Sequence, residues 1–276
     1  MFFNGISTDL FMTKAMIKNG RPFKLVIEYD GSDFAGWQVQ PNQRTVQGEI
    51  EKALKILTQK EVRVAGSGRT DAGVHALGQV VSFQVHSSLS FDELKKGLIG
   101  LLPKDISIVG MDELGEPFDA RRDAISRTYR YVIARRSRAI NRQYAWIPRI
   151  TFSVESMQEA SKYLVGEHDF TSFCKANGQT DNFISCVSDV HWQIDDGEIH
   201  FEITADRFFH HMVRSIVGTL MEVGRGKIAP EDFQQILKAK DRTCAGPTAP
   251  PQGLFLDHVE YGQNPHVFIL NDKEQK

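Results

Sequence analysis

Residues 66–76 read G-S-G-R-T-D-A-G-V-H-A, with an acidic residue, Asp71, in the middle of a glycine-rich turn. Glycine-rich loops usually bind phosphate through bare backbone N–H groups, and a carboxylate would repel that ligand. The spacing also fails two nucleotide-binding patterns. Gly73 comes two places late for G-x-G-x-x-G, and Val74-His75 stands where a P-loop has Lys-Ser/Thr. The loop therefore presents a carboxylate and does not cradle a phosphate.

Asp71 has two interpretations from the residues alone. The flanking glycines let the chain turn sharply and let a substrate approach closely, and Arg69, two residues earlier, favours the ionised acid. An ionised carboxylate held in a turn is a candidate nucleophile or base. The alternative is that Asp71 only caps its own turn, which is the commoner outcome for an isolated acid in such a loop.

The segments around this loop alternate between strand and helix patterns. In the first half, strands are predicted at 23–29, 61–65, 79–85 and 106–111. Helices are predicted after the cap Thr45 and after the capping box Ser90-x-x-Glu93. The second half predicts a strand at 126–135, a helix at 153–165, a hairpin of 183–194 with 198–206, and a helix at 209–223 that ends in a left-handed cap at Gly224. This order predicts an α+β fold with helices on one face of a sheet.

The composition is that of a globular protein with one large or two modest domains. Of 276 residues, 41% are hydrophobic and 25% charged, and no run reaches the roughly 18 apolar residues of a membrane span. The three cysteines, Cys174, Cys186 and Cys244, have no paired spacing. This argues against a disulfide framework or a zinc site and fits a reducing compartment. We therefore expect a cytoplasmic protein without a membrane partner.

The net charge of −2 does not indicate a nucleic-acid partner, but the distribution of charge does. The stretch 121–149 holds nine arginines, no lysine and one acid, and aromatic residues are interleaved with them. Arginine forks and aromatic faces bind phosphates and stack on bases. The stretch, including Arg135, Arg136 and Arg138 at an expected strand end and loop, is therefore interpreted as an RNA surface. The alternative is an ordinary solvated strand and loop.

Six segments resemble, in order, the motifs of bacterial tRNA pseudouridine synthases of the A type. They are EYDGSDFAGWQ (28–38), GRTDAGVHA (68–76), RTYRY (127–131), GEHDFTSF (166–173), FFHHMVRSIVGTLMEVGRG (208–226) and APPQGLFLDHVEY (249–261). The resemblance runs from residue 23 to residue 261. It implies an isomerase that converts uridine to pseudouridine at positions 38, 39 and 40 in the anticodon arm of tRNA without a cofactor. It also implies a homodimer whose chains each have two sheet-plus-helix domains sharing a continuous antiparallel sheet around a basic central cleft.

The resemblance also implies roles for five residues. Asp71 matches the family's catalytic aspartate, and Arg214 in HHMVR matches its basic partner. Tyr129, the first tyrosine of RTYRY, matches the residue that stacks on a uracil flipped out of the RNA. Arg69 is carried over as a phosphate-binding residue and His75, in the same motif, as a substrate-binding residue. Without the resemblance, Tyr129 could be ordinary core and Arg214 could snorkel from a buried helix. Whether Asp71 attacks the uracil ring or the ribose stays open.

Three histidines, His75, His210 and His211, raise the question of a metal site. His210 and His211 are adjacent rather than four apart, and no acid lies at ligand spacing. No metal is therefore expected.

The competing functional class is a non-catalytic RNA-binding or RNA-assembly protein, and a hydrolase using Asp71 and His75 is a weaker third. The expected divisions are an N-terminal extension (1–21), an N-terminal domain carrying the Asp71 loop (22–119), a C-terminal domain (120–265) and a tail (266–276).

Overall fold

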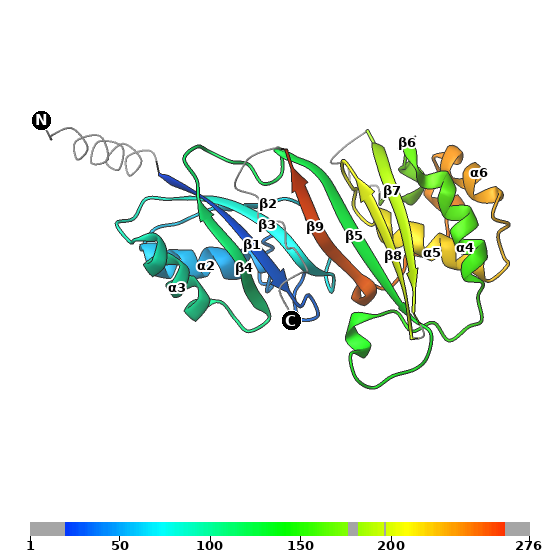
Figure 1. Ribbon diagram of the computed structural model, residues 1–276, viewed down its shortest axis with the longest axis horizontal. Coiled ribbons are helices and arrows are strands. Elements are labelled where there is room, and N and C mark those ends of the chain that lie inside the picture. Colours follow the sequence, from blue (N-terminus) through cyan, green and yellow to red (C-terminus); the bar gives the residue numbers. More distant parts are fainter. Residues whose placement is uncertain (1–19, 176–181, 196, 263–276) are drawn as a thin grey trace, which may run out of the picture.

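The computed structural model describes residues 20–175, 182–195 and 197–262. Most of the predicted extension, up to residue 19, and the predicted tail lie outside the described residues. Within them, one nine-stranded sheet runs through both halves of the chain in the order β4-β1-β3-β9-β5-β8-β7-β6, and β2 pairs with β3 (Figure 1). The strands are β1 (Arg21–Tyr29), β2 (Val64–Gly66), β3 (His75–Val85), β4 (Ile106–Glu113), β5 (Ala124–Ala134), β6 (Gly166–Asp169), β7 (Ile184–Ile194), β8 (Glu198–Ala205) and β9 (Leu254–Tyr261).

The helices accompany the two ends of this sheet. In Figure 1, α2 and α3 lie beside β1 and β4, and α4, α5 and α6 lie at the β6–β8 end. Their bounds are α2 (Val46–Thr58), α3 (Phe91–Leu101), α4 (Val154–Ser161), α5 (Met212–Gly224) and α6 (Asp232–Ala239). Short 3-10 turns are η1 (Arg142–Tyr144), η2 (Lys162–Leu164), η3 (Thr171–Phe173), η4 (Arg242–Cys244) and η5 (Pro251–Gly253). The predicted α+β class is confirmed.

Both helices predicted for the first half begin at the predicted caps. The hydroxyl of Thr45 accepts from the Gly48 N–H at 3.2 Å, and Ser90 and Glu93 form the reciprocal capping box before α3. Each satisfies backbone donors that a helix N-terminus would otherwise leave without partners. The local sequence therefore determines where α2 and α3 start.

The sheet differs from the expectation at its centre. β3 and β9 pair in parallel, over His75 with Phe255 and Ala76 with Leu256, whereas the expected sheet was antiparallel throughout. β9 also pairs antiparallel with β5, so this last strand of the described chain joins the two halves. The division into domains near residue 119 stays a prediction.

The predicted helix at 209–223 starts later than expected. His211 adopts a left-handed φ of 68°, which interrupts the helical backbone, and α5 begins at Met212. Its other end also differs, because Gly224 lies inside the helix and the left-handed glycine is Gly226, with φ 73°. The turn before α5 places two histidines and an arginine at the helix start.

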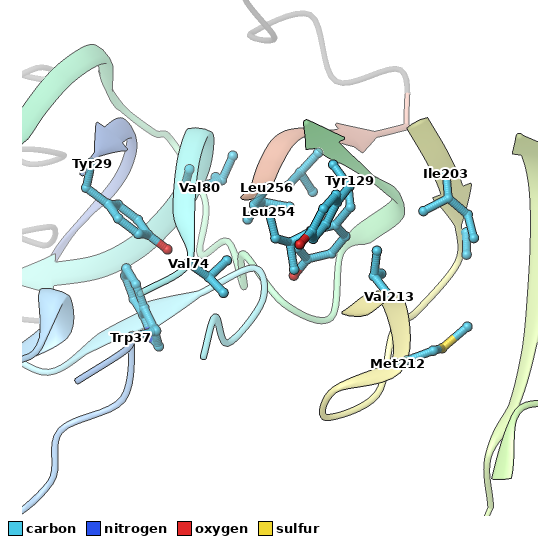
Figure 2. Packing of buried hydrophobic residues seen from close by; sticks show 14 of the residues in the cluster. Tyr29, Trp37, Val74, Val80, Tyr129, Ile203, Met212, Val213, Leu254 and Leu256 are labelled. Atoms are coloured by element: carbon cyan, nitrogen blue, oxygen red, sulfur yellow. The ribbon is translucent and has the colours of Figure 1, made fainter. Parts of the chain in front are cut away.

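One hydrophobic cluster extends through both halves of the sheet. Along β5, Tyr129 and Tyr131 belong to this cluster, whereas Arg130 between them pairs with Glu202 and Asp257 on the opposite face. This alternation follows from the two-residue period of a strand. Figure 2 shows the Tyr129 ring beside Leu254 and Leu256 of β9, with its hydroxyl directed toward the region of Val74.

Candidate active site

Asp71 lies in the loop between β2 and β3, which close packing holds in place. A Cβ on Gly66 would lie 2.5 Å from the Trp37 ring, so a larger residue would displace the tryptophan. The backbone N–H of Trp37 donates to the Thr70 carbonyl at 3.0 Å, and the hydroxyls of Thr70 and Tyr29 are hydrogen-bonded at 2.8 Å. On the other side of Asp71, Gly73 has a left-handed φ of 75°. These contacts fix the position of the carboxylate.

Arg214 in the first turn of α5 makes the closest contact with Asp71. Its Nη1 donates to Asp71 Oδ2 at 2.8 Å, and its Nε donates to the Ala249 carbonyl at 2.8 Å. The Arg214 side chain is 13% exposed and the Asp71 side chain is 17% exposed. A charge-assisted hydrogen bond of this kind is shorter and stronger than a neutral one. The fold thus brings together the two residues predicted to be catalytic.

His210 and His211 also face the same carboxylate. His210 Nε2 lies 3.4 Å from Asp71 Oδ1, and His211 Nε2 lies 3.6 Å from Oδ2. Burial lowers the pKa of His211; the Asp71 charge opposes that effect, and the charges of His210 and Arg214 add to it. In the fold, Asp71 is therefore the acidic neighbour of His210 and His211, although no acidic residue lies at metal-ligand spacing from them in the sequence.

The donor atoms of Asp71, His210 and His211 lie within 4.8 Å of one another, a spacing that a transition metal could use. The Arg214 guanidinium on the same carboxylate opposes a second cation there. The cluster is therefore not assigned as a metal centre.

Tyr129 is 7% exposed and packs edge-on against Phe208, with ring centroids 5.0 Å apart. Burial raises the pKa of Tyr129, and the charges of Tyr29 and Asp71 raise it further. The side chain is therefore a neutral phenol held in a fixed orientation near Asp71.

Asp71, Arg214 and Tyr129 line one cavity of about 1390 Å³. Its wall also carries basic side chains from several elements and three phenylalanines. They are Arg69, Arg121, Arg122, Arg127, Lys175, Arg207, Phe183, Phe208 and Phe209. Guanidinium groups bind phosphate and phenylalanine rings stack on bases, so this wall suits a polynucleotide. Four of the five predicted site residues, including Arg69, lie on it.

The fifth predicted site residue, His75, does not line this cavity. It is buried at the start of β3, where its Nδ1 accepts from the Gly31 N–H at 3.0 Å and its ring stacks on Phe255. It borders a separate cavity of about 480 Å³. Burial lowers the pKa of His75, partly opposed by Asp30. These contacts connect the loop after β1 with β3 and β9, and the substrate-binding role of His75 stays a prediction that the geometry does not favour.

The arginines of the stretch 121–149 do not all face one place. Arg121, Arg122 and Arg127 line the Asp71 cavity. Arg127 is buried and donates to the Ser67, Arg121 and Asp206 carbonyls. Arg138 borders the separate cavity and pairs with Glu198. Only part of the stretch therefore faces the space beside Asp71.

A family model described as "tRNA pseudouridine synthase" matches residues 25–122 and 160–262. The chain belongs to this family. It is 44% identical to tRNA pseudouridine synthase A of Caldicellulosiruptor bescii, over 87% of this chain and 100% of that one. It is 41% identical to tRNA pseudouridine synthase A 2 of Clostridium perfringens over the same shares. Identity to tRNA pseudouridine synthase A of Geobacillus kaustophilus is 43%, over 90% of this chain and 98% of that one.

A chain in the solved "Crystal structure of the archaeal box H/ACA sRNP Nop10-Cbf5 complex" matches with a TM-score of 0.34 and 10% identity. The match covers 72% of this chain and 44% of that one, and it is too distant to bear on function.

Membership of the family makes the chain an isomerase of the pseudouridine synthase class, as the sequence motifs predicted. Sequence reasoning missed His210 and His211 as neighbours of Asp71, because it measured ligand spacing along the chain. The available signal was their position four and three residues before Arg214, the residue matched to the aspartate's partner. No helix among the described residues is long and apolar enough to cross a membrane.

Proposed function

We propose that the chain isomerises uridine to pseudouridine at positions 38, 39 and 40 in the anticodon stem-loop of tRNA, with Asp71 as the nucleophile. The observation that carries this proposal is the carboxylate of Asp71, fixed by Arg214 at 2.8 Å and open to a basic, partly aromatic cavity. A protein that only bound RNA would gain nothing from an acid at that place. A reaction that uses a carboxylate as its nucleophile requires an acidic residue there.

The reaction needs the target base to leave the RNA stack. Tyr129 stacks on the flipped uracil, and such stacking contributes about 1–3 kcal/mol per base. Arg214 keeps the carboxylate oriented through its two hydrogen bonds, one to Asp71 and one to Ala249. Arg69, Arg121 and Arg122 bind backbone phosphates along the cavity. The chain itself provides all these groups, and no cofactor takes part.

Four further features belong to the proposal and rest on the family resemblance. The chain acts as a homodimer in the cytoplasm, and it consists of an N-terminal domain (22–119) and a C-terminal domain (120–265). The cavity lined by both halves is the central cleft that receives the RNA.

The direct test incubates the purified protein alone with an unmodified tRNA transcript and maps pseudouridine in the anticodon arm by carbodiimide labelling and primer extension. The parent should form pseudouridine there. Asp71→Asn and Asp71→Ala should form none, yet both should bind the transcript with near-parental affinity, because the packing of Gly66 and Gly73 is unchanged. Turnover by either variant above a trace would refute the nucleophile assignment. Binding of tRNA without any pseudouridine from the parent would favour the non-catalytic alternative.

A further inference from the structure

His211 is held in a backbone conformation that a residue with a side chain rarely adopts. Its φ of 68° is left-handed, and such strain costs about 1 kcal/mol or more outside glycine. The turn is kept by hydrogen bonds from Met212 N–H to the Phe209 carbonyl and from Ser215 N–H to the His211 carbonyl. Its consequence is that the His211 imidazole lies beside Asp71, with Nε2 at 3.6 Å from Oδ2. Strain maintained at a candidate active site calls for a role for the strained residue.

Pseudouridine formation requires a proton acceptor at one ring atom. The N1–C1′ bond breaks and a C5–C1′ bond forms, after which C5 carries both the sugar and a hydrogen atom. That hydrogen must leave as a proton so that its electron pair can restore the C5=C6 double bond, and N1 must gain a proton. C5 adjoins C6, so a uracil in contact with the Asp71 carboxylate brings C5 near the groups around that carboxylate.

Most groups that line the cavity near Asp71 are poor acceptors. The Arg214 guanidinium carries no acceptor. Tyr129 is a neutral phenol whose pKa burial raises. Asp206 already accepts from the Ser185 hydroxyl and the Cys186 N–H, both at 2.9 Å. Asp71 is engaged by Arg214 and by the reaction itself.

His211 can accept a proton at neutral pH. Burial lowers its pKa below the ordinary 6.5, and the imidazole is therefore neutral at pH 7. The charged and titratable groups that face it are Asp71 from the β2–β3 loop, His210 and Arg214 beside it in the chain, and Lys175 after η3. His210 makes a similar contact with Asp71 but is more exposed, at 37% against 26%. This comparison makes His211 the stronger candidate and His210 its natural control.

We propose that His211 is the base that removes the C5 proton during isomerisation. Its Nε2 takes the proton as the C5–H electron pair forms the C5=C6 bond, N1 takes up a proton from water, and the imidazolium returns its proton to water. No proton is gained or lost overall. This inference rests on the proposed function, since it needs a uracil positioned against Asp71.

The test uses His211→Asn, because asparagine tolerates a left-handed φ but cannot serve as this base. The matched control is His210→Asn. Single-turnover rates are measured on tRNA transcripts that carry hydrogen or deuterium at uridine C5. His211→Asn should lower the rate by about 10²–10⁴-fold, the usual contribution of a general base, and should show a primary isotope effect that the parent lacks. His210→Asn should stay within about tenfold of the parent and show no isotope effect.

Two further measurements separate the chemical role from a positional one. His211→Gly fits φ 68° without strain, and added imidazole should restore part of its rate. Well below the lowered pKa of His211 the imidazole is protonated, so proton removal should become rate-limiting and the parent should then show the isotope effect, whereas His211→Asn should show it at every pH.

A near-parental rate for His211→Asn would overturn the inference. A rate loss without an isotope effect and without imidazole rescue would also overturn it, because that result describes a positioning residue. Either result leaves the proposed function intact provided that Asp71→Asn is inactive. An active Asp71→Asn would instead remove the proposed function itself.

Discussion

Arg214 on α5 and Asp71 in the β2–β3 loop are joined by a 2.8 Å hydrogen bond between residues from opposite halves of the chain. The same guanidinium is anchored by its Nε to the Ala249 carbonyl, and the Ala249 N–H donates back to the Arg214 carbonyl at 2.9 Å. The arginine is thus fixed by the segment that leads into β9, the strand that joins the halves. Arg214 therefore orients the Asp71 carboxylate and adds a contact between the halves that β9 joins.

Arg214→Gln should reduce turnover far more than it reduces tRNA affinity. It removes the charge partner of Asp71, and losing one partner of a part-buried charged pair costs about 1–3 kcal/mol. Arg214→Lys should recover only part of the activity, because lysine lacks the planar fork whose Nε and Nη1 reach Ala249 and Asp71 together. Single-turnover rates, tRNA affinity and thermal unfolding are measured for each variant. Arg225→Gln is the control, since Arg225 pairs with Glu222 on the surface of the same region. Equal effects of the two Gln variants would contradict the assigned role.

Tyr129→Phe tests which part of the tyrosine acts. The ring packs against Phe208, and phenylalanine keeps that packing together with the face that stacks on uracil. Activity should therefore survive in Tyr129→Phe. Tyr129→Ala should lose activity and about 3–5 kcal/mol of stability, because it leaves a cavity in the core.

Rates at saturating tRNA and urea unfolding are measured together for both variants of Tyr129. Failure of Tyr129→Phe in a stable protein would show that the hydroxyl moves a proton or orders the site. Near-parental rates for both variants would remove Tyr129 from the reaction.

His258 on β9 should give the stability a measurable pH dependence. A hydrogen bond with Asp257 raises its pKa, burial opposes this, and the charges of Asp257 and nearby glutamates add to it. A raised folded-state pKa adds stability below the unfolded value of about 6.5, and that stability is lost as pH rises through the folded pKa.

His258→Gln should therefore reduce the unfolding free energy more at about pH 5.5 than at about pH 8.5. The difference should be at most about 1 kcal/mol, because the side chain is half exposed. Urea unfolding at the two pH values is the measurement, with the exposed His191→Gln as the control. A larger loss of unfolding free energy at the higher pH would contradict the raised pKa of His258.

Local signals predicted much of this architecture. The caps at Thr45 and Ser90 predicted the starts of α2 and α3, because they depend on a few neighbouring residues. The parallel pairing of His75 with Phe255 could not be predicted, since it depends on where a strand nearly two hundred residues later enters the sheet. Whether an arginine of the stretch 121–149 lines the Asp71 cavity depends in the same way on partners elsewhere in the chain.

Asp71 and Arg214 were predicted through ordered motifs, and the fold places them in contact. The contacts of Asp71 with His210 and His211 required the three-dimensional structure, because Asp71 lies in the first half of the chain and both histidines lie in the second. His75 shows the opposite case. His75 lies in the same motif as Asp71, but it is the first residue of β3 and its ring borders another cavity.

Arg121 and Arg122 should carry measurable contacts with the RNA backbone, because both are exposed and line the Asp71 cavity. Replacing both with Gln should make the line of log affinity against log salt shallower by up to about 1.8, at about 0.7–0.9 for each lost phosphate contact. Stability should change by less than about 0.5 kcal/mol, as for most surface substitutions. The matched control is the double variant Arg135→Gln and Arg136→Gln, whose side chains are exposed but do not line that cavity. Affinity for a tRNA transcript is measured across a salt series for parent, variant and control. A slope that changes in the control but not in the Arg121 and Arg122 variant would place the RNA on the opposite end of β5.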